Sequence, residues 1–100
     1  MRTITKQSVE AFLDKKDFHK DNTTVTYYPA TDHSEMLLYG NLIAKKYWKG
    51  CGRIWVSLCG YNTRTTRERL NGFPTVSITT KRGVPYLKGW EMSETEFVAV

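Results

Sequence analysis

The chain begins with apolar residues at helical spacing. Val9, Phe12 and Leu13 form one stripe at positions i, i+3 and i+4, with polar and charged residues around them. This pattern predicts an amphipathic helix over residues 5–16. Thr5 stands before the first turn and is the expected N-cap, because its hydroxyl can accept a hydrogen bond from a free backbone N–H.

Strand-forming residues follow the helix. Residues 17–22 are polar and predict a connection, and residues 23–28 are rich in Thr, Val and Tyr, which favour a strand. Residues 35–48 are also β-like but are interrupted by Gly40-Asn41. That dipeptide could form a two-residue hairpin turn or a bulge within one long strand. We favour the long, bent strand.

The central part of the chain predicts a turn and a further strand. Residues 48–52 contain two glycines and predict a turn. Residues 53–60 alternate, so that Ile54, Val56 and Leu58 face one way while the residues between them face the other.

The next segment predicts a short helix. Thr63 or Thr65 can cap its N-terminus, and Thr65 with Glu68 has the spacing of a capping box. Gly72 is the expected C′ residue that ends the helix. The predicted helix therefore lies between Thr63 and Gly72.

Two strands joined by a turn and a short terminal strand complete the pattern: residues 75–81, 84–88 and 97–100. The turn lies at Arg82-Gly83. Pro85 lacks a backbone N–H, which favours an edge position for the second of these strands.

The elements together predict an α+β fold in the order α-β-β-β-α-β-β. We expect a mostly antiparallel sheet of about five strands, with an N-terminal helix and a short helix after the central strand. One hundred residues suit a single domain over 1–100, and a hydrophobic fraction of 40% is enough for a core.

Membrane insertion and secretion are not expected. No apolar run approaches the roughly 18–20 residues of a membrane span, and the N-terminus lacks the apolar segment of a signal peptide. Cys51 and Cys59 are too few for a disulfide framework, and we expect both thiols to be reduced.

The charge distribution changes this picture, because the basic residues are concentrated. Residues 1–44 carry five Lys or Arg against six Asp or Glu, and residues 89–100 carry three glutamates. Residues 45–88 carry Glu68 alone against ten basic residues: Lys45, Lys46, Lys49, Arg53, Arg64, Arg67, Arg69, Lys81, Arg82 and Lys88. Such a segment attracts an acidic partner if the charges also cluster in space.

The short helix is the first candidate site. Arg64, Arg67 and Asn71 share one helical face at 100° per residue, while Arg69 points elsewhere. Free N–H groups at the first turn and two guanidinium groups suit a phosphate or carboxylate. The alternative is a well-capped helix with a solvated basic face. The other candidate contacts are Lys45, Lys46, Lys49, Arg53, Lys81 and Arg82.

Aromatic residues interleave with this basic segment. Trp48, Trp55 and Tyr61 are candidate stacking residues, because single-stranded nucleic acid binds where bases stack on rings while cations follow the backbone. The alternative is that these rings belong to the core, as most aromatics in a small domain must.

Catalytic and cofactor motifs are missing from the sequence. His19 and His33 have no Cys or carboxylate at metal-ligand spacing, and no Gly-rich phosphate loop or nucleophile elbow is present. We therefore expect a binding protein without cofactor or metal, and not an enzyme.

Two segments carry a distinctive pattern. Residues 38–44 are Leu-Tyr-Gly-Asn-Leu-Ile-Ala, and residues 59–71 are Cys-Gly-Tyr-Asn-Thr-Arg-Thr-Thr-Arg-Glu-Arg-Leu-Asn. They resemble a group of small proteins of unknown function encoded by tailed bacteriophages. That group has Gly-Asn and Ile-Ala in a strand, then Gly-Trp-x-Thr-x-Thr-Thr-x-x-Arg-Leu-Asn; Tyr61 stands here in place of Trp. The resemblance covers residues 36–92 and excludes the N-terminal helix.

The resemblance implies a phage origin and a location in the cytoplasm of an infected bacterial host, but no activity. The leading hypothesis is an accessory protein that binds the nucleic-acid backbone through residues 45–88. The runner-up is an inhibitor of a host nucleic-acid-handling protein, such as an anti-CRISPR or transcription inhibitor. A third interpretation is an assembly partner that forms a homodimer through a sheet edge.

Overall fold

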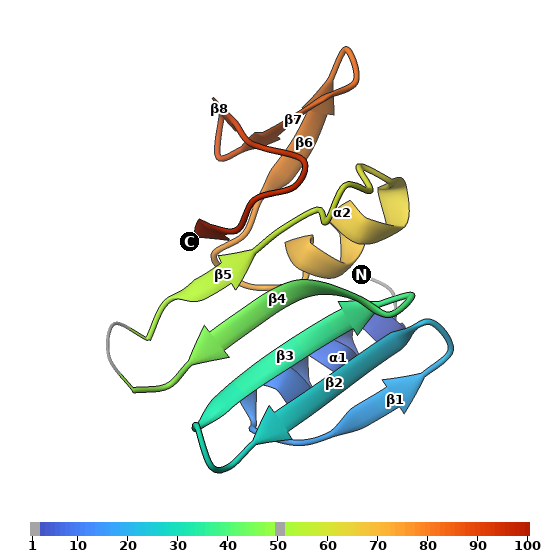
Figure 1. The fold of residues 1–100 in the computed structure, drawn as a ribbon. Helices are drawn as coiled ribbons and strands as arrows, with labels where there is room; N and C mark the ends of the chain where they lie inside the picture. The colour runs from blue at the N-terminus through green and yellow to red at the C-terminus, as the bar shows by residue number, and fades with distance from the viewer. Residues whose placement is uncertain (1–2, 50–51) are drawn as a thin grey trace.

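The computed structural model describes residues 3–49 and 52–100. Within these ranges the chain forms two helices and two antiparallel sheets, which is an α+β fold as the sequence predicts (Figure 1). The large sheet has the strand order β1-β2-β3-β4-β5-β9, and the small sheet has the order β6-β7-β8. The expectation of one sheet of about five strands therefore undercounts the strands and misses the division into two sheets.

The strands of the large sheet are β1 (Phe18–Lys20), β2 (Thr23–Tyr28), β3 (His33–Leu38), β4 (Asn41–Tyr47), β5 (Ile54–Val56) and β9 (Val98–Ala99). Strand β2 has the predicted bounds. Strand β1 lies in the segment predicted as a connection, where only three residues pair with β2. So short a run of Phe, His and Lys carries no periodic signal, and its pairing with β2 depends on the tertiary structure.

Helix α1 (Thr3–Leu13) lies against one face of the large sheet, behind β2 and β3 in Figure 1. Val9 and Phe12 of the predicted stripe are buried and Leu13 is half-buried, while Ile4 is buried as well. The Ser34 hydroxyl of β3 donates a hydrogen bond of 3.0 Å to the Phe12 carbonyl and joins the helix to the sheet. The predicted cap at Thr5 is wrong, because Thr5 lies inside the helix and is buried.

A hairpin joins β3 to β4, so the interpretation of residues 35–48 as one long strand is wrong. Leu38 pairs with Asn41, and the two-residue loop is Tyr39-Gly40. Both loop residues have positive φ, 52° and 78°, which is the conformation of a type I′ turn. Glycine at the second loop position makes this conformation accessible.

The same pair of strands also contains a bulge. Met36 pairs with Ala44, but the next residue of β3, Leu37, pairs with Leu42. Ile43 is therefore the extra residue in β4, and both Ile43 and Ala44 are buried. The bulge lets two successive residues of one strand turn toward the interior.

Strand β5 confirms the alternation seen in the sequence. Ile54, Val56 and Leu58 are all buried, although regular pairing with β4 ends at Val56. The Ser57 hydroxyl donates to the Thr95 carbonyl at 3.1 Å, which ties this segment to the C-terminal region. Strand β9 then pairs with β5, and confirms the predicted terminal strand.

Helix α2 (Arg64–Asn71) is the predicted short helix. Thr63 is its N-cap and accepts a hydrogen bond from the Thr66 backbone N–H at 3.2 Å. Gly72 ends the helix, but with φ of −69° and not with the left-handed conformation expected of a C′ glycine. A Cβ atom at this position would lie 2.5 Å from Thr5 Cγ2 and 2.9 Å from Val9 Cγ2. Glycine is therefore required by the close approach of α1.

The small sheet contains β6 (Ile78–Lys81), β7 (Val84–Leu87) and β8 (Trp90–Glu91). The hairpin at Arg82-Gly83 is confirmed, with φ of 53° and 79° at its two loop residues. The prediction of an edge position for the Pro85 strand is wrong, because β7 is the middle strand. Pro85 lies beyond the residues that pair with β8, so its missing N–H interrupts no pair of that ladder.

One buried cluster connects the two sheets and both helices. It includes Phe12 from α1, Met36 from β3, Leu70 from α2 and Leu87 from β7. The rings of Phe12 and Phe73 meet edge to face, with centroids 4.9 Å apart. The apolar positions of the whole chain thus contribute to a continuous interior.

No helix in the described ranges is long and apolar enough to cross a membrane. The prediction for the cysteines lies partly outside the described residues, because Cys51 is not among them. Cys59 is a half-buried, unpaired thiol.

Candidate nucleic-acid interface

Asn62 connects two of the predicted basic segments. Its side-chain amide donates to the Gly83 carbonyl at 3.2 Å, so the tip of the β6–β7 hairpin lies beside the segment that leads into α2. The Arg67 guanidinium donates to the Asn62 side-chain oxygen at 2.6 Å and to its carbonyl at 3.1 Å. Residues twenty-one positions apart in sequence thus meet at one place.

Exposed cations surround Asn62. Arg64 is exposed and lies one turn before Arg67 on α2, while Lys81 and Arg82 are exposed at the neighbouring hairpin tip. We call Arg64, Arg67, Lys81 and Arg82 the helix–hairpin cluster. These four predicted site residues come from the two elements that Asn62 joins.

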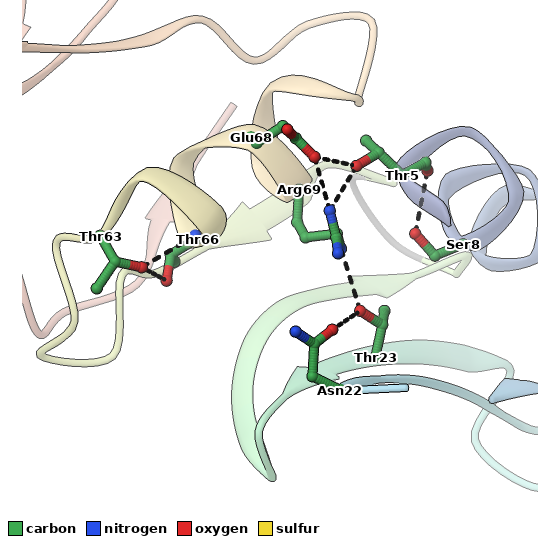
Figure 2. A network of polar contacts seen from close by, with 8 residues as sticks. All are labelled: Thr5, Ser8, Asn22, Thr23, Thr63, Thr66, Glu68 and Arg69. Atoms are coloured by element: carbon green, nitrogen blue, oxygen red, sulfur yellow. Dashed lines mark hydrogen bonds and ion pairs between the residues drawn. The ribbon is translucent and has the colours of Figure 1, made fainter. Parts of the chain in front are cut away.

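Arg69, also predicted as a site residue, is buried instead, with 1% of its surface exposed. Figure 2 shows its guanidinium between α1, β2 and α2: its Nη1 donates to Thr5 Oγ1 and to Glu68 Oε1, both at 2.7 Å. Its Nε donates to Thr23 Oγ1 at 3.1 Å. Arg69 therefore joins three elements inside the fold and presents no charge to a partner at the surface.

Asn71 is engaged in a backbone contact. Its side-chain oxygen accepts from the Ile78 N–H at 2.6 Å, and its amide donates to the Ile78 carbonyl at 2.9 Å. This pair of hydrogen bonds fixes the start of β6 against the end of α2. Asn71 is therefore engaged in a structural contact with β6, whereas the sequence predicted that it shares a binding face with Arg64 and Arg67.

The other basic residues predicted as contacts lie toward the start of β5. Lys46 pairs with Ile54, so Lys46, Lys49 and Arg53 lie where β4 ends and β5 begins. We call these three residues the sheet-end group. Lys45 lies across from Trp55, with its ammonium 4.5 Å from the centre of the Phe97 ring. The sequence could not show that these residues lie apart from the helix–hairpin cluster, because their positions depend on the direction in which each strand and helix runs in the fold.

Trp48 is not a free stacking surface. Lys15 Nζ lies 5.0 Å and Lys46 Nζ lies 4.2 Å from its ring centre, and its Nε1 is buried without an acceptor among the described residues. Trp55 is half-buried, whereas Tyr61 is 56% exposed. Of the three predicted stacking residues, Tyr61 alone presents most of its ring to solvent.

Asp32 balances the positive charge near Trp48. The Tyr27 hydroxyl donates to Asp32 Oδ1 at 2.6 Å, and Lys15 Nζ lies 3.1 Å from the same oxygen. The hydrogen bond from Tyr27, followed by that from Lys15, lowers the pKa of Asp32 below its usual value. The same hydrogen bond raises the pKa of Tyr27. The carboxylate is thus held ionised, and it offsets part of the charge of the sheet-end group.

The sequence reasoning missed an aromatic stack across three strands. The His33 ring lies between Tyr28 and Tyr47, with both centroid distances 4.7 Å and interplanar angles of 14° and 25°. Thr31 contacts His33 Nδ1, and Glu35 Oε2 lies 3.2 Å from His33 Nε2. The three residues pair directly in register, which no periodicity within one segment reveals.

This stack lies on the face of the large sheet opposite α1. Side chains alternate between the two faces along each strand, so Tyr28, His33 and Tyr47 point away from α1 while their neighbours in the strands point toward it. Figure 1 shows the face of β2, β3 and β4 away from α1 open toward the viewer. Tyr28 is 41% and Tyr47 is 43% exposed. The open face thus carries exposed aromatic surface.

No group of three or more potential metal ligands occurs in residues 3–49 and 52–100.

Residues 1–99 match the model of a protein family described as Kyanoviridae Gp96 protein. No curated protein and no solved structure matches the chain.

Proposed function

Because the chain belongs to the Kyanoviridae Gp96 family, a family of phage proteins, we propose that it is a phage accessory protein that binds the nucleic-acid backbone in the cytoplasm of the infected host. It acts by binding and catalyses no reaction. The helix–hairpin cluster is the main contact, and the partner's phosphates are its ligands. The sequence of the nucleic acid contributes little, because phosphate contacts carry no sequence information.

One observation carries this proposal: the hydrogen bonds of Asn62 bring α2 and the β6–β7 hairpin together. Arg67 is held in place by Asn62, so its guanidinium loses little freedom when it binds a phosphate. Arg64 and Arg82 are exposed on either side and are not engaged by neighbouring carboxylates within the described ion pairs. Fixed and free cations together suit an extended anionic strand.

The sheet-end group extends the proposed interface. Six residues, 54–59, separate Arg53 from Gly60, and an extended chain of that length spans roughly 20 Å at about 3.3 Å per residue. This is an upper limit, because residues 59–60 form a turn. That distance corresponds to about six base-pair steps of duplex at 3.4 Å each. Two groups of cations at this separation can contact one nucleic acid at two places.

The test is a titration of a fluorescently labelled oligonucleotide with the full chain at increasing salt. Each phosphate contact contributes about 0.7 (single strand) to 0.9 (duplex) to the slope of log affinity against log salt. The double variant Arg64→Ala/Arg82→Ala should lower that slope by about two contacts' worth. Arg64→Lys/Arg82→Lys should preserve it, because a backbone contact needs the charge and not the planar fork.

Lys6→Ala is the matched control, because Lys6 is exposed on α1 and belongs to neither the helix–hairpin cluster nor the sheet-end group. It should leave the slope unchanged. The proposal fails if the unaltered chain gives no binding at low micromolar concentration and about 50 mM salt, where phosphate contacts are strong.

A second candidate function rests on the open face of the large sheet. Exposed tyrosines on a firm strand scaffold are common in protein interfaces, so this face suits a host nucleic-acid-handling protein that the chain inhibits. A pull-down from nuclease-treated host lysate tests it. Capture of a partner should survive nuclease and be lost in Tyr28→Thr/Tyr47→Thr, but not in Trp90→Ala, which changes an exposed ring of the small sheet.

A further inference from the structure

A cleft opens between the β3–β4 hairpin and the start of α2. It has a volume of about 310 Å³, and its apolar lining comes from Leu38, Ile43 and Leu58. Tyr39 and Tyr61 stand at the cleft with 72% and 56% of their surfaces exposed. The cleft therefore combines a buried apolar floor with two rings that remain largely in water.

We propose that this cleft receives one unpaired base of a nucleic-acid strand, which stacks on Tyr39 and Tyr61. The inference rests on the proposed function and deepens it: the helix–hairpin cluster holds the phosphates, and the cleft selects unpaired over paired strands. A base inside a duplex cannot enter, because its faces are covered by its neighbours.

Size and composition favour a single base as the occupant. Ligand pockets usually measure about 300–1,000 Å³, so this cleft lies at the small end of the range, and one flat ring system fits within it. Thr63 and Thr66 also line the cleft. Their hydroxyls hydrogen-bond to each other at 2.9 Å, and the pair keeps one O–H donor for the polar edge of a base. An apolar floor under a polar rim suits a base, which has an apolar face and a polar edge.

Charge complementarity points to the same occupant. Thr63, at the rim of the cleft, lies between Asn62 and Arg64 in the chain, and Arg67 bonds to Asn62. The phosphates on either side of an inserted base would therefore lie close to guanidinium groups. An uncharged apolar peptide side chain would gain nothing from these cations.

Both rings are carried by tight turns. Tyr39 is in the type I′ turn, and its N–H donates to the Asn22 carbonyl at 2.8 Å. The Tyr61 N–H donates to the Leu58 carbonyl at 2.8 Å, and its own carbonyl accepts from the Thr63 N–H at 2.9 Å. The backbone beneath the rings is thus fixed before any ligand arrives, which lowers the entropic cost of stacking.

The first experiment uses the unaltered full chain and two labelled ten-nucleotide probes. One is oligothymidylate, and the other is a strand of the same length in which every nucleotide is an abasic site. Both probes have the same backbone charge. We expect the abasic probe to bind between about 5- and 150-fold more weakly, the range that base stacking on one aromatic residue spans. Equal affinity would overturn the base-binding cleft while leaving the proposed function standing.

The second experiment assigns the difference to the two rings. Tyr39→Asn/Tyr61→Leu removes both rings, and Asn tolerates the positive φ at position 39. This variant should bind both probes equally and at about the affinity of the unaltered chain for the abasic probe. Tyr39→Phe/Tyr61→Phe should keep the difference, and so should Trp90→Ala, which removes a ring that is 81% exposed outside the cleft.

The outcomes separate the two proposals. Discrimination that persists in Tyr39→Asn/Tyr61→Leu would overturn the cleft as the base site, and binding of neither probe by the unaltered chain would overturn the proposed function together with it. A circular dichroism spectrum shows whether the variant is folded. If it is not, Tyr61→Leu alone is the variant to test, with a smaller loss of discrimination expected and unchanged discrimination counting against the cleft.

Discussion

Arg69 carries a buried charge, which the fold tolerates because the guanidinium is hydrogen-bonded to several neighbouring side chains. Its guanidinium donates to two threonine hydroxyls and to the Glu68 carboxylate, and the Thr5 hydroxyl donates to the same carboxylate at 2.8 Å. Thr23 in turn donates to the Asn22 side-chain oxygen at 2.9 Å. A chain of polar contacts therefore runs from α1 through Arg69 of α2 to the β1–β2 turn (Figure 2).

Truncation of Arg69 should therefore cost far more stability than truncation of its exposed neighbour. Arg69→Ala removes a buried side chain, takes a hydrogen bond from two buried threonine hydroxyls and leaves a void, so we expect the free energy of unfolding to fall by about 2–5 kcal/mol. Arg64→Ala should stay within about 0.5 kcal/mol. Urea denaturation of the two variants measures both values, and similar losses in the two would contradict this account of Arg69.

The segments that carry the family resemblance have structural roles at this scale. Thr63 caps α2, Leu70 is fully buried and Asn71 binds the backbone of Ile78. The binding residues that we propose lie between and beside these positions, as Arg64 and Arg67 do. The sequence pattern therefore mixes residues that build the helix with residues that the helix presents.

At the scale of elements, the contact between α1 and α2 sets the position of the candidate interface. Helix α2 approaches α1 so closely that position 72 has no room for a side chain, although its φ of −69° is open to any residue. The first turn of α2 and the hairpin beside it are thus positioned by the packing at the other end of the helix.

Gly72→Ala should therefore destabilise the protein through overpacking and not through backbone strain. We expect a loss of about 1–3 kcal/mol, the usual cost of an added group in a filled interior. Thr5→Ser removes the methyl group that lies nearest to the new Cβ and keeps the hydroxyl that bonds to Arg69.

The double variant Thr5→Ser/Gly72→Ala should recover part of the loss relative to the sum of the two single variants, as a double-mutant cycle by urea denaturation would show. Additive losses would mean that the Thr5 methyl is not the obstacle. Helix α2 would then have adjusted elsewhere.

At the scale of the whole molecule, the two sheets share one buried cluster. Residues of α1, β3, α2 and β7 all contribute to it, so neither sheet has a separate interior. A common core favours a single cooperative unfolding transition.

Tryptophan fluorescence can test this, because the chain has rings in both sheets. Trp48→Phe/Trp55→Phe leaves Trp90 in the small sheet as the reporter, and Trp90→Phe leaves the two rings of the large-sheet region. Each variant should show the same urea midpoint by fluorescence as by far-UV circular dichroism. Midpoints that differ between the probes within one variant would show that the sheets unfold separately.

Part of the candidate site could be predicted from sequence, and the rest could not. The Thr63 cap and the exposure of Arg64 follow from local rules, since capping and helical spacing involve residues a few positions apart. The burial of Arg69 could not be predicted, because its partners Thr5 and Thr23 are 64 and 46 positions away. The stack of Tyr28, His33 and Tyr47 depends on strand register in the same way.

The sequence by itself determined the α+β class, α1, β2, the alternation of β5, the capped helix α2 and the Arg82-Gly83 hairpin. Each depends on periodicity or turn chemistry within a few neighbouring residues. The tertiary structure decided how the strands divide into two sheets, which basic residues meet at Asn62 and which arginine is buried. These outcomes depend on contacts between distant segments, and a local pattern contains no information about which distant segment will lie opposite.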